Sequence, residues 1–364
     1  MGADTRVLLV GSAPFDSVID SYRRALSPHY QVQHFDPFSV LGGLENRLGP
    51  SRALRLNVRI GYLVNMFVRE PLALVEPRLL RVAREFAPDI VLVTCIESLR
   101  PKVVAGLRGG NMRCKVIGVF SDAMVNFGRS YFFGADYHAL FFKDHYIVDR
   151  FRAKLGWRHV HYLPQACDRV LHRKLPLSDA DRATYGCDIT VAGNLYPWRA
   201  AMLGPLVGRD VKIWGPPPSS WLEYPIAARH TGRYVAGDEK CKAMLASRIV
   251  LNQNHYAEVA GTNKRTFEVA AIGAFQLTDT PALSDVFDPE TEVSSFGTQK
   301  EMIEKIDYFL ARPELCAEMA ERARVRAHAQ HTYEHRWVAH LETVGLRPPT
   351  EFPVQPESLV VRAV

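Results

Sequence analysis

Three charged residues interrupt an otherwise apolar stretch, NKRTFEVAAIGAFQL at 263–277, and the two cations among them suit an anion site. Asn263 is a typical helix-capping residue, which would place Lys264 and Arg265 in the first helical turn. Cations there oppose the helix dipole, at a cost of about a few tenths of a kcal/mol unless an anion is bound. Glu268 follows one turn later among small apolar residues, where it can accept hydrogen bonds from a ribose diol. The alternative is that Glu268 caps its own turn or pairs with Lys264 at i,i−4.

Polar residues also end the apolar run that precedes this stretch, RIVLNQNH at 248–255. The run predicts a buried strand that leaves Asn252, Asn254 and His255 at its carboxyl end. These side chains would then lie close to the amino terminus of the helix predicted from Asn263.

A second loop with binding character lies in VAGNLYPWRAAML, residues 191–203. A predicted strand ends at Gly193, Asn194 can hydrogen-bond locally, and Pro197 suits the first turn of a helix. Arg199 lies just inside that helix, where free N–H groups and a forked guanidinium favour phosphate. The alternative is an ordinary strand–helix turn with a surface arginine. The loop is not a Walker motif, because no Gly-Lys-Ser/Thr follows the glycine.

Fewer residues with chemical potential occur in the first half of the chain. Asp122 ends the run GVFSD, where its carboxylate could serve as a general base or simply cap a turn. In FFKDHY, the residues Lys143, Asp144 and His145 end another predicted strand and are candidates for acceptor or phosphate contacts.

Alternating strands and helices must position these residues. Apolar β-branched runs bounded by Gly, Pro and Asp predict strands, and periods of 3.6 residues predict helices. In the first half we expect a strand that feeds a tight loop at 6–15, further strands at 30–37, 88–95, 114–123 and 137–144, and helices at 17–26 and 76–86. In the second half we expect strands at 187–193, 210–215 and 248–255, a helix from 263, and one long helix from about Lys300. This order favours parallel α/β sheets, and two units of similar plan suggest a cleft between them.

The length and composition agree with two globular domains. A chain of 364 residues exceeds one ordinary core, and 47% hydrophobic with 23% charged residues is typical of a folded protein. We expect domains at 1–165 and 166–340, joined near YLPQACD, and a Pro-rich tail at 341–364 that is an extended strap or loose.

The charge pattern limits the partners. A net charge of +6 favours phosphorylated ligands, but the basic residues are too dispersed to favour nucleic acid. The segment 52–69 interleaves arginines with aliphatic residues and predicts either peripheral contact with an anionic membrane or a solvated surface helix. No apolar run reaches the roughly 18–20 residues of a membrane span.

The cysteines indicate the compartment. There are six, widely spaced and without a C-x-x-C pair, which favours buried reduced thiols. The amino terminus lacks the pattern of a signal peptide. We therefore expect a cytoplasmic protein, with 52–69 as a potential contact to the inner membrane face.

The segment from Tyr185 to Trp337 resembles the CgeB-like glycosyltransferases, relatives of the GT4 and GT1 groups with the GT-B fold. The resemblance rests on a series of motifs, which are CDITVAGNLYPWR, GRYVAGDEKCKAMLASRIVLNQN, GTNKRTFEVAAIGAFQLTD, FDPETEVSSF and the run from EMIEKIDYF to HTYEHR. The resemblance covers nearly half of the chain, and the first 160 residues match only in their general α/β plan.

The resemblance implies a GT-B fold of two Rossmann-like domains, an acceptor site in the first and a nucleotide-sugar site in the second. By this resemblance Arg199 and Arg265 contact the diphosphate and Glu268 the ribose. Other residues that would approach the sugar and phosphates are Gly193, Asn194, Asn254, Gly261, Thr262, Asn263 and Lys264. The donor would be a UDP, GDP or dTDP sugar, and a tightly bound cofactor or metal is not expected.

The sequence departs from the family at one position. The wider group places a second glutamate about eight residues before the ribose-binding one, whereas here the candidate is Glu258, ten residues before Glu268. Asn254 or His255 could take its role.

Three other functions compete with glycosyl transfer. HTYEH at 331–335 fits the H-x-x-E-H pattern of inverted zinc peptidases, but no third ligand helix accompanies it. A nucleotide-sugar epimerase shares the GT-B architecture, and a non-catalytic sugar-nucleotide-binding protein would share the donor site. The prediction is a metal-independent hexosyltransferase, with Asp122, Arg199 and Arg265 as its catalytic residues.

Overall fold

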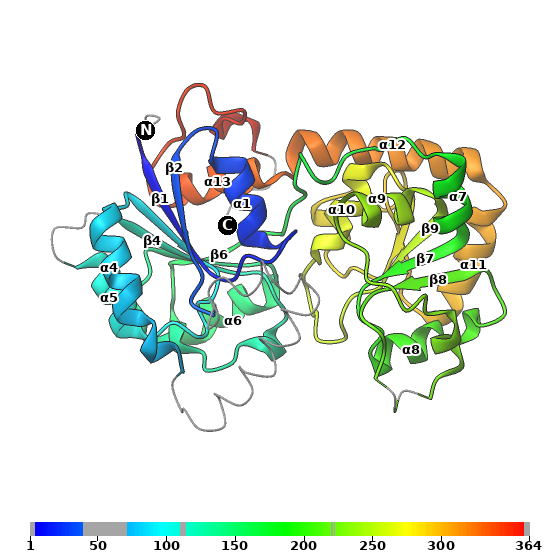
Figure 1. Cartoon of the computed structure of the whole chain (residues 1–364), viewed down its shortest axis with the longest axis horizontal. Helices are drawn as coiled ribbons and strands as arrows, with labels where there is room; N and C mark the ends of the chain where they lie inside the picture. Colours follow the sequence, from blue (N-terminus) through cyan, green and yellow to red (C-terminus); the bar gives the residue numbers. More distant parts are fainter. Residues whose placement is uncertain (1–3, 39–70, 110–113, 220, 222, 360–364) are drawn as a thin grey trace. The chain divides into compact units, whose positions relative to one another are not determined.

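The computed structural model describes residues 4–38, 71–109, 114–219, 221 and 223–359. The predicted Arg-rich segment 52–69 lies outside the described residues. The chain divides into two compact units, each built on a parallel β-sheet (Figure 1). Two α/β units were expected from the alternation of strands and helices, and this expectation is confirmed.

The first unit contains a sheet of six strands. In spatial order the strands are β2 (Gln31–Phe35), β1 (Arg6–Val10), β3 (Ile90–Val93), β4 (Lys115–Phe120), β5 (Ala139–Phe142) and β6 (Val160–Tyr162). Its helices are α1 (Val18–Leu26), α4 (Glu76–Phe86) and α5 (Pro101–Arg108), with 3-10 turns η1 (Pro71–Leu74), η2 (Met124–Asn126) and η3 (Tyr131–Gly134). The continuous apolar runs of β1 and β3 are fully buried, as expected for central strands covered on both faces.

The second unit contains a sheet of five strands. In spatial order they are β11 (Ser294–Ser295), β10 (Gln276–Thr278), β9 (Ser247–Asn252), β7 (Cys187–Ala192) and β8 (Val211–Trp214). Its elements further include α6 (His145–Leu155), α7 (Asp179–Tyr185), α8 (Pro197–Leu203), η4 (Gly204–Leu206), η5 (Pro225–Arg229), α9 (Gly237–Leu245), α10 (Lys264–Ile272), η6 (Leu283–Asp285), α11 (Gln299–Leu310), α12 (Pro313–Gln330), most of α13 (Tyr333–Thr343) and η7 (Pro356–Ser358). Although α6 lies between β5 and β6 in the sequence, it packs with this second unit.

The strand order creates one special position in this sheet. From β7 the chain first moves to β8 on one side and then returns to β9 on the other. The loops after β7 and β9 therefore diverge at the carboxyl edge, and this switch point is where open α/β sheets bind ligands. The loop residues 193–196 and 253–263 occupy it.

The prediction of one long helix from about Lys300 is wrong. The region forms α11, α12 and α13, with breaks at Arg312 and His331. Pro313 causes the first break, because proline lacks the N–H that α11 would need to continue and instead suits the first turn of α12. His331 leaves the helical region at φ −129° and ends α12.

Several described residues that follow α13 are buried against other parts of the protein. Phe352 is 3% exposed, and its ring lies 5.0 Å from that of His29 and 5.8 Å from that of Tyr30. Residues 340–353 cluster with the first unit, and residues 354–359 cluster with the second. The domain boundaries at 165 and 340, as limits of independently folding segments, stay a prediction.

All six cysteines are buried and form no disulfide, in agreement with the thiols expected from their spacing. Among the described residues, no helix combines the length and apolar character that a membrane crossing requires.

A tight backbone contact joins the loop after β7 to the residue that follows β8, and it generates a prediction. A Cβ on Gly215 would overlap the carbonyl oxygen of Gly193, whereas a Cβ on Gly208 would meet nothing within 4 Å. Because a backbone atom cannot move aside as a side chain can, we expect Gly215→Ala to destabilise the protein by about 1–3 kcal/mol. The control Gly208→Ala should have almost no effect. Urea unfolding measures both, and equal midpoints for the two variants would contradict the prediction.

Candidate functional site

Two arginines from different helices converge on Gly193, directly after β7. A Cβ placed on Gly193 would lie 2.8 Å from Nη2 of Arg265 and 3.1 Å from Nη1 of Arg199. Gly193 also has a φ of 126°, in the region that L-residues rarely adopt. The glycine therefore leaves room for both guanidinium groups, which we call the arginine pair. Of the residues predicted from the sequence, these three are brought together.

Arg199 is a buried cation held by backbone oxygens. It is 5% exposed, its Nη1 donates to the carbonyl of Asn194 at 2.6 Å, and its Nη2 donates to that of Gln253 at 2.8 Å. Its charge also faces the ring of Tyr196, 4.7 Å away. Within the described part of the chain, its Nε has no hydrogen-bond partner. Burial and the neighbouring Arg265 together lower the pKa of Arg199 to about 10.

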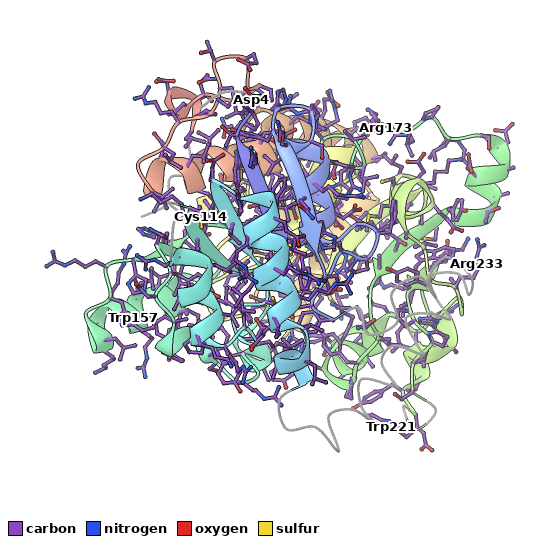
Figure 2. The ribbon with its side chains drawn as sticks, turned by 60° about the vertical axis from the view of Figure 1, so that its left-hand side comes forward. Asp4, Cys114, Trp157, Arg173, Trp221 and Arg233 are labelled. Carbon is purple, nitrogen blue, oxygen red and sulfur yellow. The ribbon has the colours of Figure 1, made fainter. Side chains whose placement is uncertain are left out.

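Other arginines of the second unit are neutralised differently. Arg173 and Arg233 lie at its surface (Figure 2) and form ion pairs with Asp238 and Glu239. Such exposed pairs are weak and need no ligand. The arginine pair, in contrast, brings a buried and a half-buried guanidinium group of like charge together, so an anion bound there would reduce their repulsion.

Asp279, in the loop after β10, balances part of this charge. Its Oδ1 accepts a hydrogen bond from the backbone N–H of Asn254 at 2.6 Å. Burial raises the pKa of Asp279 to about 6, although the Asn254 bond and the charge of Arg199 both oppose the rise. The sequence offered one signal for this residue, because Asp279 follows a strand that ends at the same edge of the sheet.

A buried polar network fixes the start of α10 against β9 and β10. The side-chain amide of Asn252 donates to Asn263 at 3.2 Å and to Thr266 at 3.2 Å, and Asn263 donates back to Asn252 at 3.1 Å and also to Asn254. Further members of the network are Gln276, Thr278 and Thr280. Asn263 caps α10 as predicted, since its side chain accepts from the N–H of Thr266.

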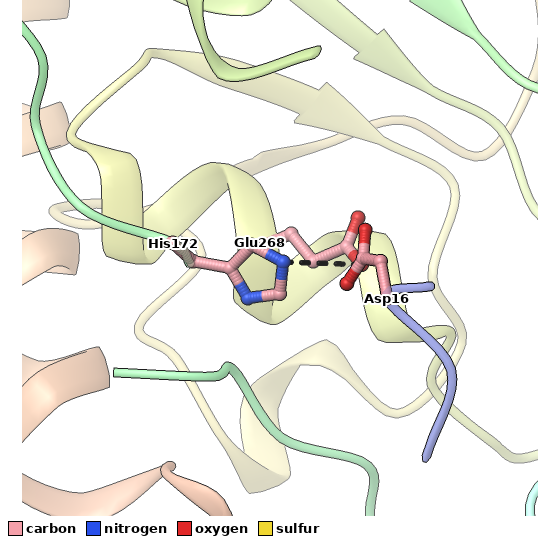
Figure 3. Close-up of side chains that lie close together, drawn as sticks. All are labelled: Asp16, His172 and Glu268. Atoms are coloured by element: carbon pink, nitrogen blue, oxygen red, sulfur yellow. Dashed lines mark ion pairs between the residues drawn. The ribbon is translucent and has the colours of Figure 1, made fainter. Parts of the chain in front are cut away.

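Three basic groups lie close to the carboxylate of Glu268. Its carboxylate oxygens lie 3.1 Å from Nζ of Lys240, 3.3 Å from Nζ of Lys264 and 3.6 Å from Nε2 of His172. Figure 3 shows the His172 ring reaching Glu268 from a segment outside the helix. The i,i−4 pair with Lys264, one of the two interpretations of the sequence, is present, and the ribose role of Glu268 stays a prediction. Lys240 and His172 were missed because they lie 28 and 96 residues away in sequence.

Two more predicted residues lie in the loop between β9 and α10. Thr262 is fully buried, and its Oγ1 has no hydrogen-bond partner among the described residues. Gly261 packs against Lys143 and Glu258, since its Cβ would lie 2.9 Å from the carbonyl of Lys143. Glu258 itself forms a buried ion pair with Lys143.

Asp122 belongs to the first unit and is exposed in a turn. Its carboxylate accepts from the N–H of Ala123 at 2.8 Å and from the side-chain amide of Asn126 at 2.8 Å. These are the contacts of a turn-capping residue, which was the second interpretation of Asp122.

The histidines of HTYEH are engaged within the protein. His331 uses Nε2 on the carbonyl of Val286 at 2.8 Å and Nδ1 on Arg336 at 3.1 Å. His335 contacts the hydroxyl of Thr332 through Nδ1 at 2.8 Å. Burial and the charge of Arg336 lower the pKa of His335 to about 4 and hold that of His331 low. The motif therefore joins α12 to α13 as a structural element.

Comparison with known proteins finds similarity to glycosyltransferases in the second half of the chain. Residues 174–342 match a family model described as glycosyl transferase-like. The spore protein CgeB of Bacillus subtilis (strain 168) is 27% identical over 178 residues, a match that covers 44% of this chain and 54% of CgeB. This chain thus spans about half the length of that curated relative. The resemblance to CgeB-like glycosyltransferases is confirmed.

Solved structures confirm the GT-B fold. A sucrose-phosphate synthase from Thermosynechococcus elongatus has a TM-score of 0.65 at 11% identity, covering 91% of this chain and 96% of that one. Anabaena HepE in complex with UDP and glucose has a TM-score of 0.56 at 12% identity, covering 89% and 94%. The N-terminal domain of trehalose-6-phosphate phosphatase from Candida albicans has a TM-score of 0.57 at 11% identity, covering 90% and 96%.

Asp279 gives a prediction for stability against pH. Its pKa rises from 3.8 to about 6 on folding, so the native state binds the proton more tightly than the unfolded state does. The stability that it contributes is complete below pH 4 and falls by at most about 3 kcal/mol as the pH rises through 6. Asp279→Asn keeps the acceptor for Asn254 and removes this loss. The variant should therefore gain stability over the unaltered protein between pH 4 and pH 7.

The control is the same change at Asp307, an exposed carboxylate whose pKa the hydrogen bond with Arg209 lowers. Between pH 5 and pH 7 this group is ionised in both states, so Asp307→Asn should show no such trend. Chemical unfolding at several pH values measures the differences. A constant difference between Asp279→Asn and the unaltered protein would contradict the assignment.

Proposed function

Since residues 174–342 are glycosyl transferase-like, we propose that this protein transfers a sugar from a nucleoside-diphosphate sugar to an acceptor. The observation that carries the proposal is the arginine pair at Gly193, at the switch point of the second sheet. A diphosphate has the charge and size to neutralise two guanidinium groups, and arginine binds phosphate oxygens in a forked geometry.

The same groups suit the chemistry of transfer. When the bond between the anomeric carbon and the diphosphate breaks, negative charge grows on the leaving oxygen. Fixed cations that already face this oxygen stabilise the transition state more than the ground state. In this proposal Arg199 and Arg265 supply the charge that a metal ion would otherwise supply, and the positive end of α10 adds to it. The reaction is then metal-independent.

We propose a hexosyl donor with a uridine nucleotide, ahead of GDP and dTDP sugars. Structures of Anabaena HepE contain UDP with glucose and UDP-glucose, and that protein shares the fold of this chain. Glu268 is the proposed ribose contact. It would accept from the ribose hydroxyls, and its ion pairs with Lys240 and Lys264 would hold the carboxylate in position.

The acceptor site is proposed for the first unit, with Asp122 as general base. Its carboxylate is exposed at the end of β4, where a hydroxyl group could reach it. The acceptor class, the membrane contact through 52–69 and the cytoplasmic location remain parts of this proposal. The competing functions are a nucleotide-sugar epimerase and a non-catalytic binding protein, and product analysis with and without acceptors separates them.

Replacement of Arg265 tests the proposed donor site. Hydrogen bonds to charged groups contribute about 1.5–3 kcal/mol, so Arg265→Ala should weaken donor binding about 10- to 100-fold. Arg248→Ala is the control, because Arg248 is an exposed arginine at the opposite end of β9, paired with Asp188. Calorimetry with UDP-glucose measures both. Unchanged affinity and turnover in Arg265→Ala would contradict the donor assignment.

A thermal-shift panel identifies the nucleotide. The panel contains UDP-, GDP-, dTDP- and ADP-sugars, each tested with and without EDTA. A sugar nucleotide at 100 times its dissociation constant should add about 2.7 kcal/mol of stability. We expect the UDP-sugars to give the largest shift and EDTA to leave it unchanged. A panel without any shift would contradict the proposed function.

A further inference from the structure

A short segment after β5 is bonded to the loop between β9 and α10. Asp144 and Gly261 form an antiparallel bridge, and the N–H of His145 donates to the carbonyl of Ala260 at 3.3 Å. Residues 143–156 belong to the same compact unit as this loop, although 115 residues separate Lys143 from Glu258. The two segments therefore form one local structure, which we call the loop clamp (residues 143–145 and 258–261).

The carboxylate of Asp144 connects both parts of the loop clamp. Asp144 is 5% exposed, and its Oδ1 accepts from the N–H of Tyr146 at 2.9 Å, which caps α6. Its Oδ2 accepts from the N–H of Val259 at 3.2 Å and of Ala260 at 3.1 Å. One buried carboxylate thus satisfies three backbone donors, a role in which an ionised acceptor is stronger than a neutral one.

An ion pair closes the loop clamp beside Asp144. The side chains of Lys143 and Glu258 are 5% and 4% exposed, and Nζ of Lys143 bonds to Oε1 of Glu258. A buried pair of this kind is sensitive to the loss of one partner, since the other charge is then left uncompensated. Gly261 allows the close packing, because its Cβ would lie 3.0 Å from Oε2 of Glu258 and 3.2 Å from Cβ of Asp144.

The loop clamp holds one end of a loop whose other end the polar network holds. Beyond Gly261 the chain continues to Thr262, fully buried, and to Asn263, which caps α10 and bonds to Asn252. Arg265 follows two residues later and belongs to the arginine pair. The residues proposed to approach the donor thus lie between two fixed points, so the loop is ordered before any ligand arrives.

We propose that Lys143, Asp144 and Glu258 are positioning residues that hold the loop 258–263 in its donor-binding conformation. This inference rests on the proposed donor site and extends it to residues that the sequence had placed in other roles. Lys143 and Asp144 were candidates for acceptor or phosphate contacts, and Glu258 for the second glutamate of the family. In the structure, Lys143 pairs with Glu258, and Asp144 accepts from backbone N–H groups of the loop. A loop ordered in advance binds more tightly, because the ligand need not offset the entropy of ordering it.

Asp144→Asn tests the proposal, with Asp149→Asn as its control. Asparagine keeps one acceptor oxygen but turns an NH₂ group toward the backbone donors, so the loop should loosen. Asp149 is exposed on the same helix and receives the same change. Affinity for UDP-glucose, or for the panel member that binds the unaltered protein, is measured by calorimetry well below both melting temperatures. Hydrogen exchange of the amides at 259–263 is measured without ligand.

We expect Asp144→Asn to bind at least 10-fold more weakly and to exchange these amides faster, with turnover at saturating donor changed less than 3-fold. Asp149→Asn should match the unaltered protein in all three measurements. A merely stabilising role would lower the melting temperature and leave affinity and exchange unchanged, which would overturn the inference. If the unaltered protein binds no sugar nucleotide, the proposed function fails first and the inference fails with it.

A second pair of variants covers the case in which Asp144→Asn does not fold. Glu258→Gln leaves the Lys143 charge uncompensated, whereas the double variant Lys143→Met, Glu258→Met replaces the pair with apolar side chains of similar length. We expect the single variant to lose at least 10-fold in donor affinity and the double variant to recover most of it. A single variant with unchanged affinity would overturn the proposed role of the ion pair.

Discussion

The structure of the second unit depends on one constraint, the burial of a guanidinium group beside another of like charge. Arg199 is 5% exposed and faces Arg265 at Gly193. The protein stabilises Arg199 through two backbone carbonyls, and these come from the two loops that diverge at the switch point. The glycine at 193 is therefore required by the arginines as much as by the turn.

The rest of the unit serves to keep this arrangement in place. The polar network fixes α10, which carries Arg265, to the ends of β9 and β10. Asp279 adds a carboxylate near Arg199. The charge of Arg199 lowers the pKa of Asp279, but burial has the larger effect and raises this pKa to about 6. A cation site with only partial compensation stays attractive to an anionic ligand, whereas full pairing, as at Arg173 and Arg233, would cancel that attraction.

Much of the fold and part of the site could be predicted from the sequence. Apolar runs and turn residues gave the order of strands, and Asn263, Gly193 and Arg199 were found because caps, tight turns and helix starts are local features. The prediction of a single long helix was wrong. The helical periodicity of the sequence continues through this region, but Pro313 begins a new helix. The contacts of Glu258 with Lys143 could not be predicted, since they join segments 115 residues apart and depend on where α6 packs.

The two adjacent cations at the start of α10 now have separate explanations. Successive helical residues point roughly 100° apart, so Lys264 and Arg265 cannot serve the same neighbour. Lys264 points along the helix to Glu268 one turn later, which offsets its unfavourable position at the positive end of the dipole. Arg265 points to Gly193 and Arg199, where another cation makes its position still less favourable. An anion bound at Gly193 would reduce the repulsion between Arg265 and Arg199, which agrees with the proposed donor site.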